Sequence, residues 1–140
     1  LFVPVWFVYN SNFVLFVDKS IRAQNTGDFV KANIPGDAGI MAQPGFSVEL
    51  SYLTDNRVIG LHPDPDRLAT LIDFYDIEYI IFGRYYTYDA YHISKDSAEY
   101  VGGNPDKFEL IGTIDEDYSE YYSEDNPART DQVWVYKVLR

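Results

Sequence analysis

The feature that most constrains the fold is an alternation of short apolar runs with amphipathic segments between residues 34 and 82. Three runs are short and are bounded by turn-forming residues, as strands are: Ala38 to Ala42, Arg57 to Leu61 and Ile77 to Phe82. Helical segments separate them. A strand, helix, strand, helix, strand order predicts right-handed crossovers and a parallel sheet.

The clearest helix start is Asp64-Pro65, because an Asp side chain can accept from free backbone N–H groups and proline misses no donor at the first helical position. After it, apolar residues recur at the spacing of one helix face, at Leu68, Leu71, Ile72 and Tyr75. Two further caps are predicted earlier in the chain. Asn25 or Thr26 should begin a helix that ends near Asn33, and Ser47 a helix over Val48 to Thr54.

In the second half, we expect an irregular segment over Arg84 to Tyr91, followed by a helix from a Ser94 cap toward Val101. Phe108 to Ile114 and Gln132 to Leu139 alternate apolar and polar residues, which predicts two antiparallel strands joined by a long acidic loop. The fold class is therefore α/β. We predict a three-layer, Rossmann-like domain whose mixed sheet has about five strands, three of them parallel, with an antiparallel pair at one edge.

The length of 140 residues suits one domain, and apolar residues occur throughout. Residues 20–140 are expected to form a single α/β domain. Residues 1–19 are apolar but interrupted by Pro4 and by a polar Asn10-Ser11-Asn12 stretch, so we expect either a membrane-proximal segment or a β-hairpin. The first residue is Leu1 rather than Met, from which we expect the chain to be cut from a longer protein.

Composition excludes several classes of function. The chain has no cysteine, which rules out disulfides, thiolate metal sites and thiol catalysis. The formal net charge is −11, and residues 61–140 carry seventeen acids against seven bases. Nucleic acid is therefore not expected as a partner, and an anionic membrane surface is disfavoured, because both need clustered Lys and Arg.

In open α/β sheets the ligand crevice lies beyond the carboxyl ends of the parallel strands. The loops expected there contain six candidate ligand-binding residues, which are Gln43, His62, Asp64, Arg84, Tyr85 and Tyr86. Arg84 and free N–H groups near Ser47 could hold a phosphate or a sugar. The glycine-rich signatures of dinucleotide and Walker sites are absent from the sequence. A crevice with no ligand is the competing interpretation.

His62 and Asp64 also allow an acid–base interpretation, with the carboxylate orienting the imidazole, as in a small soluble hydrolase. The structural alternative assigns Asp64 to the helix cap and His62 to a proline turn. On this alternative the chain has no catalytic residue of its own.

Six acids fall between positions 115 and 125, and from them we take Asp115, Asp117 and Glu120 as candidate metal ligands. The spacing matches no calcium-loop motif, so a solvated loop is the alternative. Four tyrosines could form a carbohydrate or protein contact surface, namely Tyr85, Tyr86, Tyr88 and Tyr91. A free-standing calcium- or carbohydrate-binding module is thus one hypothesis.

Four segments form an ordered pattern along the chain: Asn33-Ile34-Pro35-Gly36-Asp37-Ala38, Gly39-Ile40-Met41-Ala42, Tyr52-Leu53-Thr54-Asp55-Asn56-Arg57-Val58, and Asp66 to Tyr75 followed by Ile77-Glu78-Tyr79-Ile80-Ile81. This pattern resembles the C-terminal extracytoplasmic domain of GT-C type membrane glycosyltransferases, the archaeal and bacterial proteins similar to dolichyl-phosphate-mannose protein mannosyltransferases. The resemblance covers roughly residues 20 to 138. The chain lacks the W-W-D-Y-G motif of oligosaccharyltransferase soluble domains.

The resemblance implies a non-catalytic accessory domain on the outer face of the cell membrane, joined to its own upstream transmembrane region. The parent protein would act in protein glycosylation, using a lipid-phosphate sugar donor and a divalent cation. Its catalytic acids would lie in loops next to membrane helices that this chain does not contain. A glycan or protein acceptor is the further partner that the resemblance implies.

Overall fold

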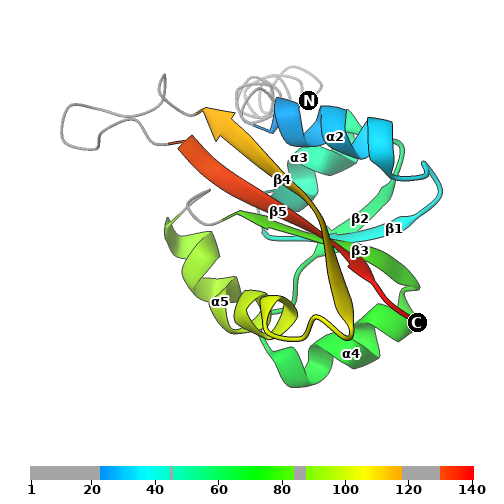
Figure 1. The fold of residues 1–140 in the computed structure, drawn as a ribbon, viewed down its shortest axis with the longest axis vertical. Helices are drawn as coiled ribbons and strands as arrows, with labels where there is room; N and C mark the ends of the chain where they lie inside the picture. Colours follow the sequence, from blue (N-terminus) through cyan, green and yellow to red (C-terminus); the bar gives the residue numbers. More distant parts are fainter. Residues whose placement is uncertain (1–22, 45, 84–87, 118–129) are drawn as a thin grey trace, which may run out of the picture.

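The computed structural model of this protein describes residues 23–44, 46–83, 88–117 and 130–140 (Figure 1). The predicted segment over residues 1–19 lies outside the described residues. In chain order, the described elements are α2 (Gln24–Asn33), β1 (Gly39–Ala42), α3 (Phe46–Leu53), β2 (Arg57–Gly60), α4 (Pro65–Phe74), β3 (Ile77–Gly83), α5 (Tyr88–Gly102), β4 (Phe108–Asp117) and β5 (Thr130–Val138).

The five strands form one open mixed sheet in the order β2-β1-β3-β5-β4. Strand β1 pairs in parallel with both β2 and β3, whereas β5 pairs antiparallel with both β3 and β4. The prediction of three parallel strands with an antiparallel pair at one edge is therefore confirmed. The parallel pairs are joined by helices because a parallel connection must return the chain to the opposite end of the sheet.

The helices cover both faces of the sheet, with α2 and α3 on one side and α4 and α5 on the other (Figure 1). One core contains Val30 of α2 and Leu50 of α3, packed with the sheet around Ile40. The opposite core contains Leu68 of α4 and Val101 of α5. All four strand positions of β1 are buried, because this strand lies between two neighbours and two helical layers.

Several element boundaries differ from the sequence predictions. Helix α2 starts at Gln24 with Ala23 at the cap position, so Asn25 and Thr26 lie inside the helix. Helix α3 begins at Phe46, which places Ser47 in its first turn rather than at its cap. The sequence-based prediction was wrong at both starts. For α2 the reason is a contact distant in sequence, because Glu116 accepts from the Thr26 backbone and takes the place of a local cap residue.

The second half of the chain is more regular than the sequence indicated. Helix α5 begins at Tyr88, so part of the segment expected to be irregular is helical, and Ser94 lies inside the helix. Strands β4 and β5 pair from Phe108↔Val138 to Asp117↔Thr130, which extends both strands into the acidic stretch predicted as a loop. Long-range pairing between the two strands supplies backbone hydrogen bonds that local propensity does not reveal. No described helix has the length and the apolar character needed to cross a membrane.

The junction of α4 with β3 departs from regular geometry at two places. Asp76 has φ 51°, which is the left-handed region that an Asp side chain tolerates better than most. Next, Gly39 pairs with Ile77 and Ile40 pairs with Tyr79, so Glu78 is the extra residue of a β-bulge in β3. Gly39 packs closely here, because a Cβ at this position would lie 2.6 Å from the Asp76 carbonyl oxygen.

We expect Gly39→Ala to lower the free energy of unfolding by about 1–3 kcal/mol, because a methyl group would overlap backbone that has little room to move. Gly60→Ala is the matched control, since a Cβ on Gly60 would meet no atom within 4 Å. It should change stability by less than about 0.5 kcal/mol. Urea unfolding of both variants checks the difference, and equal stabilities would contradict the packing described for Gly39.

Candidate functional site at the carboxyl ends of the parallel strands

The chain leaves β1 and β3 in different directions. After β1 it enters α3 on one face of the sheet, whereas the helix that follows β3 is α5, on the other face. Such a divergence creates the crevice in which α/β proteins usually bind ligands, beyond the carboxyl ends of the two strands. Gln43 follows β1 directly, and Gly83 is the last residue of β3.

Gln43 joins the ends of these two strands. Its backbone N–H donates to Ile81 O at 2.9 Å, and its Oε1 accepts from Gly83 N at 2.8 Å. The side chain is fully buried, and its Nε2 has no hydrogen-bond partner among the described residues. The amide therefore fixes the spacing of the strand ends and retains one buried donor.

The start of α3 lies beside Gln43. Near Ser47 the sequence indicated free N–H groups for a phosphate, and the N–H of Ser47 itself donates to Gln43 O at 3.1 Å. The Ser47 N–H is therefore occupied, because the carbonyl of Gln43 accepts the first helical hydrogen bond.

His62 and Asp64 lie in the loop between β2 and α4. The His62 Nδ1 accepts from the backbone N of Asp64 at 3.0 Å, and Ser97 of α5 donates its hydroxyl to His62 O. The Asp64 carboxylate instead accepts from Asp66 N at 2.9 Å. Among the described contacts, none joins the imidazole to this carboxylate, so the two side chains do not form an oriented acid–base pair.

The cap interpretation of Asp64 is confirmed, with Pro65 at the start of α4. Arg67 Nε also lies 3.8 Å from the Asp64 Oδ2, an exposed ion pair of little energetic weight. Three other candidates of this crevice, Arg84, Tyr85 and Tyr86, lie outside the described residues. Tyr88 and Tyr91 belong to α5.

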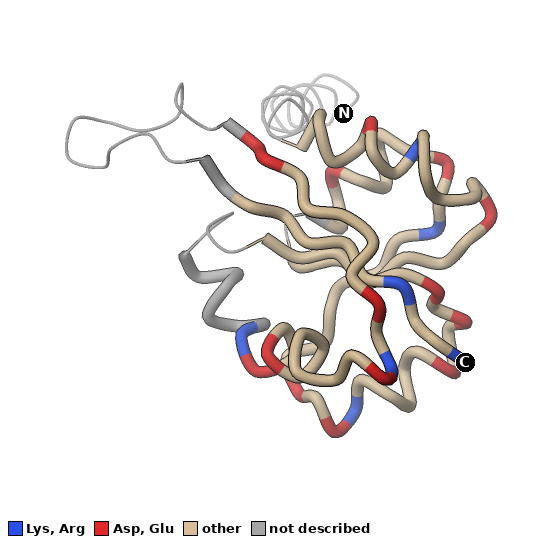
Figure 2. The backbone as a smooth tube through the Cα atoms, viewed as in Figure 1, with Lys and Arg blue, Asp and Glu red and all other residues tan. Residues whose placement is uncertain are grey.

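The candidate metal ligands are only partly described. Asp115 is exposed on β4, Asp117 ends the same strand, and Glu120 lies outside the described residues. Within the described part of the chain, no group of three acidic or histidine side chains is arranged to hold a metal ion. Acidic residues are scattered over both helical layers and the strand ends (Figure 2).

Glu116, between two of these candidates, has a role that the sequence did not indicate. Glu116 is 2% exposed, and its carboxylate accepts from the Thr26 backbone N at 2.5 Å and from the Thr26 hydroxyl at 2.7 Å. It thus caps α2 from a strand ninety residues away, in place of Ala23, which has no capping side chain. The sequence signal that could have indicated this burial is the alternation of side chains along β4. Residues 115 and 117 share one face of the strand, and residue 116 points to the other.

Burial raises the pKa of the Glu116 carboxyl above the usual 4.5. The hydrogen bonds from Thr26 act against this rise by stabilising the charged form, and the nearby negative charge of Asp28 adds to it. Desolvation is the larger effect, so the buried carboxyl binds its proton more tightly than an exposed one does.

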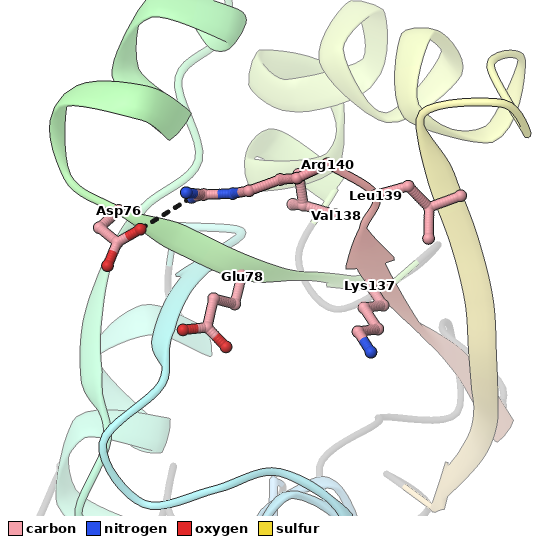
Figure 3. Close-up of a pocket in the computed structure, with 6 residues that line it drawn as sticks. All are labelled: Asp76, Glu78, Lys137, Val138, Leu139 and Arg140. Atoms are coloured by element: carbon pink, nitrogen blue, oxygen red, sulfur yellow. Dashed lines mark ion pairs between the residues drawn. The ribbon is translucent and has the colours of Figure 1, made fainter.

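A second group of charged side chains lies at the opposite end of the sheet, where the sequence predicted no site. A shallow depression of about 370 Å³ is lined by six residues from the start of β3 and the end of β5, which are Asp76, Glu78, Lys137, Val138, Leu139 and Arg140 (Figure 3). Arg140 Nη2 lies 2.9 Å from the Asp76 Oδ1 and donates to Ile77 O at 3.2 Å. The register of the antiparallel pair of β3 and β5 brings these segments together, and short-range sequence patterns do not predict that register.

The chain was compared with protein-family models, with curated proteins and with solved structures, and none of the three comparisons gave a match.

We expect Asp64→Ala to lower the free energy of unfolding by about 1 kcal/mol, because the Asp66 N–H would lose its cap acceptor. Asp64→Asn keeps a side-chain oxygen at this position and should be close to the wild type. Thermal and urea unfolding measure both variants. A loss of equal size in the two would show that the charge, and not the cap oxygen, is what matters.

Glu116→Gln should separate the titration of this group from its capping. Because the folded pKa is raised, the folded state retains a proton that the unfolded chain has released, and the associated stabilisation is full below about pH 4.5. It is lost as the pH rises through the folded pKa. The variant keeps an acceptor for Thr26 but does not titrate.

The free energy of unfolding of the wild type, minus that of the variant, should therefore fall with rising pH across this window and then level off. Urea unfolding at a series of pH values from about 4 to 8 measures it. A difference that rises with pH would mean that the hydrogen bonds to Thr26, rather than burial, dominate the pKa.

Proposed function

We propose that this chain is a non-catalytic domain on the outer face of the cell membrane, and that it accompanies a multi-spanning glycosyltransferase that uses a lipid-linked sugar donor. The proposal rests on the ordered sequence pattern and on the places that its segments occupy in the fold. It does not use any catalytic group of this chain.

The observation that carries the proposal is a direct contact between two segments of the pattern. Asn56 Nδ2 donates to Pro35 O at 2.7 Å and to Ala38 O at 3.0 Å. Asn56 is 7% exposed, so these are buried hydrogen bonds that hold the turn before β1 against the turn before β2. A polar residue at this place thus has a specific structural task.

Three other pattern residues have comparable structural roles. The Thr54 hydroxyl donates to Leu50 O at 2.7 Å and closes the last turn of α3. Tyr79 and Ile81 of β3 belong to the buried core beneath α2 and α3. These pattern residues lie in or beside the core of the α/β fold, and this position in the core is the structural support for the proposal.

In finer detail, we infer a Rossmann-like domain in which the parallel order β2-β1-β3 is retained and β5 and β4 replace further parallel strands. Its task would be to cover the active site of the membrane region or to recognise a protein or glycan acceptor. The lipid-phosphate donor and any divalent cation would be bound by the parent protein.

The test uses the complete product of the gene, tagged at its carboxyl end. It should remain in carbonate-washed membranes, and protease added to intact cells should remove the tag, because the domain would face outward. The membranes should transfer labelled mannose from dolichyl-phosphate mannose, whereas the isolated domain should not.

A complete gene product found only in the soluble fraction would overturn the proposal, as would a tag that protease reaches only after the membrane is opened. Deletion of residues 23–140 with retention of the upstream region is the matched control for transfer. Membranes carrying that deletion should lose most acceptor glycosylation. If membranes carrying the deletion glycosylate the acceptor as well as wild-type membranes do, the proposed accessory role is wrong.

A further inference from the structure

The depression lined by Asp76, Glu78 and the end of β5 contains two acidic and two basic side chains. One acidic and one basic side chain form an ion pair with each other, and the other two do not. In the first pair, the Arg140 guanidinium reaches across to Asp76 and forms the 2.9 Å ion pair (Figure 3). In the second, Glu78 and Lys137 come from neighbouring strands and extend to the same side of the sheet. Among the ion pairs of the described residues, none includes Glu78 or Lys137.

The position of Glu78 follows from the bulge. As the extra residue between Ile77 and Tyr79, it is the exposed position in a strand whose other residues are all buried. A bulge changes the direction in which a side chain leaves a strand, and bulges are frequent beside functional sites. Here the bulge supplies a carboxylate to the depression, while Lys137 pairs in register with the next residue, Tyr79.

Glu78 and Lys137, which form no ion pair with another described residue, line one depression with a carboxylate and an ammonium. Such a surface is complementary to a molecule carrying both charges. We propose that this depression binds a small zwitterion of the α-amino acid class, whose ammonium contacts Glu78 and whose carboxylate contacts Lys137. Asp76 and Arg140 also line the depression, and their ion pair holds the end of β5 against the start of β3.

Size and surface chemistry support this class of ligand. A volume of about 370 Å³ suits a small molecule, near the lower limit of ligand sites. Val138 and Leu139 add apolar surface, and Leu139 is 41% exposed, which leaves it available to an apolar side chain of the ligand. We therefore expect leucine to bind better than glycine.

Charge balance favours a zwitterion over a simple ion. The four ionisable side chains of the depression, two acidic and two basic, sum to zero formal charge. A simple anion would be repelled by the net charge of −11 on the chain, and a simple cation would be repelled by the Lys137 ammonium. This inference is independent of the function proposed for the whole domain.

The test is a titration of the 15N-labelled chain with L-leucine, followed by the amide resonances of Glu78, Lys137 and Leu139. These should shift together and saturate at millimolar concentrations, the range expected for a shallow site with two charge contacts. N-acetyl-leucine lacks the ammonium and leucine amide lacks the carboxylate, so each should bind at least about tenfold more weakly.

Glu78→Gln and Lys137→Met should each weaken leucine binding by about tenfold or more, while Lys31→Met, a change of an exposed lysine on α2, should not alter it. The spectrum of each variant reports whether it is folded. Binding that is equal for leucine and its two derivatives, or unchanged in both depression variants, would overturn the proposal. So would the absence of shifts at about 100 mM leucine.

Discussion

The structure depends on the burial of β1 between β2 and β3 and between two helical layers. Every residue of β1 is buried, so its backbone N–H and C=O groups can be satisfied only by the neighbouring strands. Parallel pairing on both sides meets this requirement. Because the crossovers from β1 to β2 and from β2 to β3 run in opposite directions along the sheet and are right-handed, α3 and α4 lie on opposite faces. The two hydrophobic cores and the crevice beyond β1 and β3 follow from that arrangement.

Two buried amides secure the ends of this central strand. Asn56 donates to carbonyls before β1, and Gln43 joins the end of β1 to the end of β3. Each side chain is nearly inaccessible, and a buried amide is stable only when its polar atoms are paired. Within the described residues, Gln43 Nε2 is the amide donor without a partner, which makes this strand end the less completely satisfied of the two.

Much of the central fold could be predicted because its signals are local. Asp64-Pro65 begins α4 through one side-chain oxygen, and the spacing of Leu68 and Ile72 places both on the buried face of that helix. The start of α2 could not be predicted in this way, since its cap is Glu116, a distant residue in sequence. The order of β1 and β3 could be predicted, but the hydrogen bonds at the candidate site could not. Gln43 accepts from Gly83, and His62 accepts from the Asp64 backbone while its carbonyl accepts from Ser97, so these bonds depend on loop conformation and on segments distant in the chain.

By itself, the sequence determined the class of fold, the order of its elements from α2 to β3 and the antiparallel character of the last two strands, because periodicity and turn chemistry act over a few residues. Only the tertiary structure decided which side chains meet. The bulge at Glu78, the ion pair of Asp76 with Arg140 and the cap of α2 by Glu116 each join segments distant in the chain. Strand register and desolvation produce those contacts, and both are properties of the packed sheet rather than of any short stretch of residues.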